Sequence, residues 1–140
     1  MLPMKRLLIL LVPAIGLMAC ASTPVSQPTL EQKLAAKNYR LGAPVERIQR
    51  YRLDGWNYLD REHVIMQTEP STYYLVSLRN TCHDLATTEH IAFTTTTGQL
   101  TRFDKLLVRG PGRTIQRCYI EALNKLEKTD KRVAAPLSPS

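Results

Sequence analysis

Apolar and polar residues alternate with a period of two through the middle of the chain, which is typical of half-buried β-strands. Residues 73–78 (YYLVSL) are the strongest strand candidate in the chain, while Asp54-Gly55 and Gly110-Pro111-Gly112 are typical of turns. The pattern predicts strands at residues 47–53, 56–60, 62–68, 73–78, 91–96, 106–108 and 114–120. Strands this short and closely spaced favour an antiparallel meander or a small barrel over a fold that alternates strands with helices.

An N-terminal helix is predicted before the strands. Thr29 is a residue type that caps helices, so we expect a short helix over residues 30–39. Gly42 and Pro44 are residue types that end helices, and we expect them to end this one.

Two weaker helical signals lie later in the chain. Thr81 is expected to cap a brief helical turn that includes Cys82, Leu85 and Ala86. The last segment repeats apolar residues every three positions, which predicts a terminal helical stretch after a strand that ends near Ile120; these residues are Ile120, Leu123 and Leu126. The expected fold class is therefore mainly β (α+β), a small antiparallel meander or barrel-like sheet with a short N-terminal helix and one or two short helical turns.

The N-terminus has the three parts of a secretory signal peptide: a charged start, an apolar middle and a small-residue end. Only 13 residues separate Arg6 from Cys20. A membrane-spanning helix needs roughly 20. Residues 17–20 (Leu-Met-Ala-Cys) resemble the bacterial lipobox, which implies cleavage before Cys20, diacylglycerol on its thiol and a further acyl chain such as palmitate on the new amine. Ordinary secretory cleavage after Ala19 is the alternative.

Removal of the signal peptide defines the expected domain organisation. Residues 1–19 are expected to be the lipoprotein signal peptide and 20–29 the lipidated cysteine with a flexible spacer. Residues 30–127 are expected to form one β-rich globular domain, and 128–140 a disordered tail. Loss of Lys5 and Arg6 lowers the formal net charge from +7 to +5. Ala21 follows the cysteine, which by resemblance to the sorting rule of enteric bacteria favours the outer membrane, facing the periplasm.

Three cysteines are an odd number for an exported protein. If Cys20 carries lipid, Cys82 and Cys118 remain, and an oxidising compartment makes them candidates for one disulfide. Two free thiols or a redox pair are the alternatives, although redox pairs are usually spaced C-x-x-C.

Candidate catalytic residues are few. Cys82-His83-Asp84 has the letters of a nucleophilic triad, but adjacent residues cannot converge as a triad requires. The three histidines His63, His83 and His90 do not have metal-ligand spacing. We therefore expect no catalytic residue, no metal site and no cofactor. An enzyme would have to draw its acid–base pair from Asp54, Asp60, Asp84 and Asp104.

Residues 109–113 (RGPGR) are the one basic glycine-rich loop. Backbone amides around Gly110 and Gly112 could form an anion nest, with Arg109 and Arg113 gripping a phosphate. An ordinary hairpin turn with solvated arginines is the alternative.

A second basic stretch, residues 40–61, interleaves arginines with aromatic residues. It is either a binding surface or the wet face of a core that contains Tyr51, Leu53 and Trp56. Its members are Arg40, Arg47, Arg50, Tyr51, Arg52, Trp56, Tyr58 and Arg61.

Residues 45–125 resemble a family of small bacterial lipoproteins that is catalogued only as a domain of unknown function. The likeness rests on Trp56, Asp60, Tyr74-Leu75, Leu78, Cys82, Leu85, Ile91, Asp104 and the run Cys118-x-Ile120-x-x-Leu123. This resemblance implies a periplasm-facing lipoprotein with paired cysteines, and it carries over no catalytic residues.

These observations predict a membrane-anchored envelope lipoprotein that is a non-enzymatic binding or assembly module. Its expected partners are the membrane, through the N-terminal lipid, and an envelope lipid, glycan or protein, but not nucleic acid. An envelope enzyme that acts on lipid or glycan with an acidic pair is the alternative. A convergent acidic pair in a deep pocket would favour the enzyme, and a shallow basic and aromatic face would favour binding.

Overall fold

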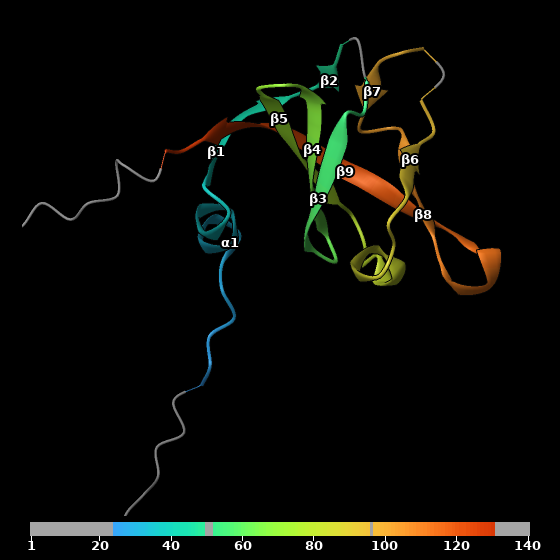
Figure 1. Cartoon of the computed structure of the whole chain (residues 1–140), viewed down its shortest axis with the longest axis horizontal. Coiled ribbons are helices and arrows are strands. Elements are labelled where there is room, and N and C mark those ends of the chain that lie inside the picture. Colours follow the sequence, from blue (N-terminus) through green and yellow to red (C-terminus); the bar gives the residue numbers. More distant parts are fainter. Residues whose placement is uncertain (1–23, 50–51, 96, 131–140) are drawn as a thin grey trace, which may run out of the picture.

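The computed structural model describes residues 24–49, 52–95 and 97–130 of the chain. The protein is mainly β, with an antiparallel sheet curled into a half-barrel, one α-helix and two 3-10 turns (Figure 1). The predicted fold class is confirmed. In chain order the elements are α1 (Leu30–Ala36), β1 (Tyr39–Val45), β2 (Arg47–Ile48), β3 (Gly55–Asp60), β4 (His63–Glu69), β5 (Thr72–Leu78), η1 (His83–Ala86), β6 (Ile91–Phe93), β7 (Leu100–Thr101), β8 (Lys105–Arg109), η2 (Pro111–Arg113) and β9 (Ile115–Lys128).

The long strand β9 organises the sheet. The strand order is β3-β4-β5-β9-β8-β6, and β1 also pairs with β9. Residues 115–119 of β9 pair with β8, residues 120–126 pair with β5, and residues 123–128 pair with β1. The short strands β2 and β7 form a separate two-stranded ladder. One 14-residue strand therefore pairs with three others and connects the β3-β4-β5 part of the sheet to the β8-β6 part.

The central strands β4 and β5 are buried on both faces. Successive residues of a strand point to opposite faces, so Val64 and Ile65 enter different clusters. The larger cluster contains Ile48, Val64, Met66, Val76, Leu78, Cys82, Leu85, Leu100, Leu106, Val108, Cys118, Ile120 and Leu123. On the opposite face α1 covers the smaller cluster, which contains Leu34, Ile65, Tyr73, Leu75 and Leu126.

The N-terminal helix forms, but it is shorter than predicted. Thr29 caps it in a reciprocal capping box with Gln32, as its residue type predicts. The helix ends at Ala36 because Asn38 adopts a φ of 63°, which a right-handed helix cannot contain. Gly42 and Pro44 do not end it. Both lie within β1, a strand that was not predicted because these residues were expected to end the helix.

The predicted terminal helical stretch is wrong, because β9 continues without a break to Lys128. A register shift opposite Ser77 and Leu78 gives β9 one extra residue near Glu121. This bulge brings Ile120 and Leu123 to the same cluster although they are three residues apart. Leu126 is three residues further on and faces the other cluster. The spacing of three between apolar residues therefore does not require a helix. It arises here because the strand contains one bulge and is buried on both faces.

The remaining strand predictions hold with smaller corrections. The first predicted strand, residues 47–53, is limited to β2, and the part at residues 50–51 lies outside the described residues. The strand predicted at residues 91–96 ends at Phe93, with residue 96 also outside the described residues. The cap of η1 is Cys82 rather than Thr81, whose hydroxyl donates instead to Glu62 Oε1.

The sequence pattern did not predict β7, which has two residues. The predicted segment 1–19, residues 20–23 of the predicted spacer 20–29 and residues 131–140 of the predicted tail 128–140 lie outside the described residues. Residues 24–29 are exposed and belong to no helix or strand, and residue 128, where the tail was predicted to begin, is the last residue of β9. Among the residues that the structure describes, no helix is long and apolar enough to cross a membrane.

Candidate functional site

The predicted pair Cys82 and Cys118 forms a disulfide. Their α-carbons lie 5.9 Å apart, and the bond closes a sequence separation of 36 residues. Both residues are buried in the larger cluster. The bond links the start of η1 to β9, so it ties the segment after β5 to the strand that organises the sheet. Its burial is typical of a structural disulfide.

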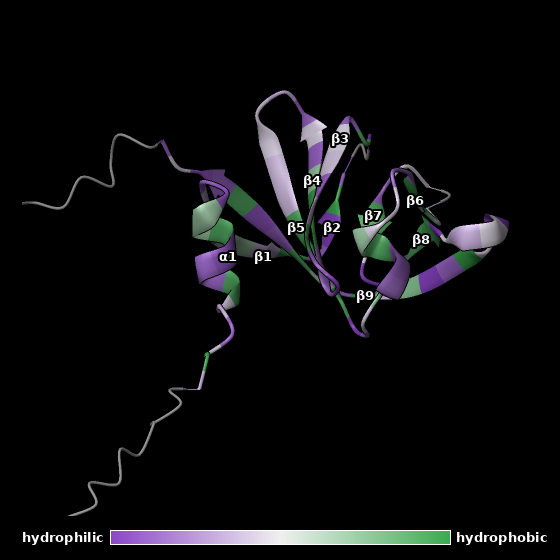
Figure 2. Ribbon diagram, turned by 60° about the horizontal axis from the view of Figure 1, so that its bottom comes forward, coloured by the Kyte–Doolittle hydropathy of each residue, from purple (hydrophilic) through white to green (hydrophobic). Residues whose placement is uncertain are grey.

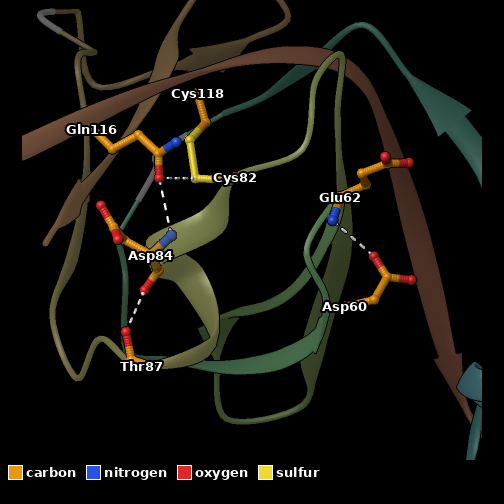
Figure 3. The surroundings of a disulfide bond; sticks show 7 residues. All are labelled: Asp60, Glu62, Cys82, Asp84, Thr87, Gln116 and Cys118. Carbon is orange, nitrogen blue, oxygen red and sulfur yellow. Dashed lines mark hydrogen bonds between the residues drawn. A yellow bond between two sulfur atoms is a disulfide. The ribbon is translucent and has the colours of Figure 1, made fainter.

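Gln116 connects this disulfide to η1 (Figure 3). Its side-chain oxygen accepts a hydrogen bond of 3.0 Å from the backbone N–H of Asp84 and lies 3.6 Å from Cys82 Sγ. The sulfur has no proton because it is bonded to Cys118. The Gln116 side chain therefore orients the η1 backbone. As an amide it cannot act as an acid or a base toward the sulfurs.

The four aspartates of the enzyme alternative do not converge. Asp54 pairs with Arg52, Asp60 with Lys33 and His63, and Asp104 accepts bonds from the backbone N–H and hydroxyl of Thr101. Asp84, which is on η1, lies beside Gly110, which precedes η2. Three of the four carboxylates are thus engaged by different local partners, and the arrangement does not support a shared acid–base site.

Asp60 is the most highly bonded of these carboxylates. It accepts a hydrogen bond from Lys33 Nζ at 2.7 Å. It also accepts one from the backbone N–H of Glu62 at 2.8 Å (Figure 3). His63 Nδ1 lies 2.8 Å from Asp60 Oδ1, the same oxygen that accepts from Glu62. Burial acts to raise the pKa of Asp60, but the hydrogen bonds from Lys33, Glu62 and His63 outweigh it and lower the pKa. This cluster fastens α1 to the β3–β4 hairpin.

The histidines are dispersed. His63 bonds Asp60, whereas His83 and His90 are exposed. No group of three or more His, Cys, Asp or Glu side chains could hold a metal ion within residues 24–49, 52–95 and 97–130.

The RGPGR loop forms the turn between β8 and β9. Gly112 and Arg113 have φ values of 65° and 64°, which produce the tight reversal. The N–H of Gly110 donates to the carbonyl of Thr114 at 2.8 Å, and a β-carbon at Gly110 would lie 2.4 Å from Asp84 Oδ2. The N–H of Gly110 therefore already has an acceptor, and the carboxylate of Asp84 lies beside it. Anion binding by this loop stays a prediction.

The predicted basic stretch at residues 40–61 is divided among several roles. Trp56 and Leu53 pack against the larger cluster, as the core interpretation expected. Arg40 pairs with Glu127, and Arg52 pairs with Asp54. Residues 50–51 lie outside the described residues. These side chains do not gather into one surface.

A hollow of about 600 Å³ lies where β1 ends and β8 begins beside β9. The register leaves residues 120–122 of β9 paired with neither β1 nor β8. Two acidic and two basic side chains contribute to the lining, so its chemistry favours no single ligand class; the lining is Pro44, Val45, Glu46, Arg47, Thr101, Arg102, Phe103, Glu121, Ala122 and Leu123.

A basic and apolar surface covers the other side of the β6–β8–β9 sheet from the core. We call it the outer face; it consists of Ala92, Lys105, Leu107, Arg109, Ile115, Arg117 and Tyr119. The register places Lys105 opposite Tyr119 and Arg109 opposite Ile115. Figure 2 shows both hydrophilic and hydrophobic segments along β9, whereas β8 is mainly hydrophobic.

The outer face exposes apolar as well as charged side chains. Ile115 is 59% exposed and Tyr119 is 46% exposed. Lys105 Nζ lies 5.1 Å from the centre of the Tyr119 ring, a cation–π contact. Beside this face is a shallow hollow of about 430 Å³, lined by His90, Ile91, Ala92, Leu107, Arg109 and Ile115. The surface is shallow, basic and partly aromatic.

Most of this surface, including Lys105, Arg117 and Tyr119, was not predicted from the sequence. A signal was present, because Arg117 and Tyr119 flank Cys118 in the predicted strand. A buried Cys118 places both neighbours on the opposite face. The register between β8 and β9, which brings Lys105 beside Tyr119, was not visible in the sequence.

The chain matches the model of a family of unknown function, DUF6491, over residues 3–136. It belongs to this family. The predicted resemblance to a family of unknown function is thus confirmed. The match to the family model covers more of the chain than residues 45–125, for which the resemblance was stated. No curated protein and no solved structure gives a significant match. DUF6491 carries no assigned activity, so the function has to be argued from the geometry.

Proposed function

We propose that this DUF6491 protein is a lipid-anchored, non-enzymatic binding module of the cell envelope. The observation that carries the proposal is the outer face, which presents exposed apolar and cationic side chains on one rigid sheet. The separation of the four aspartates favours binding over acid–base catalysis. The lipid anchor is inferred from residues 17–20, and the outer membrane facing the periplasm is the proposed location.

The buried disulfide and the N-terminal segment agree with this proposal. A disulfide suits an oxidising compartment such as the periplasm. Residues 24–29 are exposed and lead into a capped helix, as expected for a spacer between an anchor and a domain.

Metabolic labelling with a clickable palmitate analogue tests the anchor. The wild-type chain should take up label and run at the size of the processed form. Cys20→Ser should lose the label, because the thiol that accepts diacylglycerol is absent. A double variant, Cys82→Ala with Cys118→Ala, is the matched control and should keep the label. A Cys20→Ser chain that still reaches the processed size and stays in the membrane would overturn the lipoprotein assignment.

Photo-crosslinking in intact cells tests the binding surface. A crosslinking residue at Ala92 lies on the outer face, whereas one at Ala36 lies exposed on α1. We expect an identified envelope component to be captured from position 92 and not from position 36. Equal capture from both positions would contradict a role for the outer face.

A further inference from the structure

The outer face has an unusual balance of charge. At its seven positions there are three cations and no acid, and Glu121 is the next acidic position along β9. Arg79 adds a fourth cation beside Tyr119, because its backbone N–H donates to the Tyr119 carbonyl at 2.8 Å. Arg113 follows in the turn that joins β8 and β9. The hairpin is thus a local region of positive potential.

Three cations elsewhere in the domain have acidic partners. Lys33 pairs with Asp60, Arg40 with Glu127 and Arg52 with Asp54. Within the part of the chain that the structure describes, Lys105, Arg109 and Arg117 form no ion pair. Their charge is therefore available to an external anion.

Apolar side chains are interleaved with these cations instead of forming a separate patch. Ile115 lies opposite Arg109, and Tyr119 lies between Lys105 and the Arg79 backbone. Phe103, in the turn before β8, is 81% exposed under the guanidinium of Arg102. Surfaces that mix basic with aromatic and aliphatic side chains suit the boundary between lipid phosphates and acyl chains.

We propose that the outer face docks onto a bilayer that contains anionic phospholipid. The proposal deepens the proposed function, since it names the partner of the binding module and relies on the anchor to bring the domain near lipid. Charge complementarity selects an anionic surface. A β-sheet face with charges in several rows matches a layer of many phosphates better than one extended acidic peptide.

The anchor makes a weak contact sufficient. The nine residues 21–29 between Cys20 and α1 can span about 30 Å at most. The domain therefore stays close to the membrane, and docking becomes an intramolecular step with a high effective concentration. The start of α1 and the β8–β9 hairpin lie at opposite ends of the molecule (Figures 1 and 2). Tether and outer face would then hold the domain at two separated points.

Vesicle flotation with the unlipidated protein tests this proposal independently of acylation. The chain from residue 20 with Cys20→Ser retains both core clusters and the disulfide, so it keeps the whole described domain. It is mixed with vesicles of phosphatidylcholine alone or with added phosphatidylglycerol. We expect binding only to the anionic vesicles, and high salt should abolish it because exposed charges are screened.

Charge-neutralising variants assign the contact to the outer face. Arg109→Gln with Arg117→Gln should weaken binding by about thirtyfold, from about fivefold for each cation near an anionic surface. Lys37→Gln with Lys125→Gln removes the same charge at exposed positions away from the outer face and should weaken binding far less. Ile115→Ser should weaken binding a few-fold without changing its salt dependence.

Three results would overturn the proposal: no binding to anionic vesicles, equal binding to zwitterionic vesicles, or equal losses in the two double variants. The first would direct attention to an acidic protein as partner. None of these results bears on Cys20, whose acylation is read separately by labelling. A chain that fails to take up palmitate but binds anionic vesicles would refute the anchor and leave the docking face intact.

Discussion

The backbone of Gly42 approaches the carbonyl group of Lys125 so closely that a β-carbon at position 42 would lie 2.7 Å from its oxygen. The approach occurs where the register between β1 and β9 shifts, between Leu41 and Pro44. Glycine at this position lets an irregular strand stay paired with β9. Gly42, which the sequence suggests as a helix end, is therefore required for the close packing of β1 on β9.

Gly42→Ala should destabilise the domain by about 1–3 kcal/mol, because the methyl group forces the β1 backbone away from β9. Urea unfolding followed by the fluorescence of Trp56 measures the loss. Gly55→Ala is the matched control, since a β-carbon there meets only Gln67 Oε1 at 3.6 Å. If both alanine variants lose the same stability, steric contact with Lys125 is not the cause.

Loss of the disulfide should lower stability without changing the fold. The bond closes a separation of 36 residues, which corresponds to about 3–4 kcal/mol in the chain-entropy model. The variant with Cys82→Ala and Cys118→Ala should keep the wild-type far-UV circular dichroism spectrum and unfold at a lower temperature. Reduced wild-type protein should behave in the same way. A reduced protein as stable as the oxidised one would contradict this account.

Thiol labelling checks the pairing itself. After denaturation without reduction, neither Cys82 nor Cys118 should react with a maleimide. After reduction both should react, and the bound mass should correspond to two labels on these positions. Full labelling before reduction would show that the bond is absent from the isolated protein.

The sequence predicted well those strands in which alternation and local turns agree. Residues 73–78 became β5 with only one residue added, and Asp54-Gly55 marks the start of β3. The disulfide was predicted from cysteine parity and compartment, which depend on chemistry and not on topology. These features are local or compositional, so one sequence is sufficient to show them.

The errors arose where long-range pairing overrode the local pattern. Residues 120–126 have a helical period, but pairing with β5 on one edge and β1 on the other makes them a strand. The outer face was missed for a related reason, because it depends on the register between β8 and β9. Lys105 becomes a neighbour of Tyr119, and Leu107 of Arg117, only after the hairpin has closed.

Leu34 is expected to be essential for holding α1 on the sheet. It is the one fully buried residue of α1, and Leu30 of the same helix packs against the smaller cluster while only partly buried. A seven-residue helix is not stable alone in water, so its stability must come from packing. Leu34→Ala should cost about 2–5 kcal/mol in urea unfolding. Leu41→Ala, at a site 37% exposed, should cost much less, and comparable losses would refute the packing role of Leu34.

The Asp60 cluster should make stability depend on acid pH. Lys33 and His63 are the basic groups that contact this carboxylate, and the backbone N–H of Glu62 also donates to it. Burial opposes ionisation, but these hydrogen bonds prevail and hold the pKa of Asp60 below its ordinary value of 3.8. The folded state therefore binds this proton less readily than the unfolded state. The resulting stabilisation is complete above pH 3.8 and is lost as the pH falls through the lower, folded pKa.

Asp60→Asn should consequently lower the free energy of unfolding at neutral pH by about 1–3 kcal/mol, since charged hydrogen bonds become neutral ones. The difference from wild type should shrink as the pH is lowered below 3.8, because protonation removes the same charge from the wild-type chain. Urea unfolding at neutral and acid pH measures both effects. Asp130→Asn, an exposed position beyond β9, is the matched control and should show neither effect. A difference between Asp60→Asn and wild type that stays constant with pH would mean that packing, not the charge of Asp60, holds α1 against the β3–β4 hairpin.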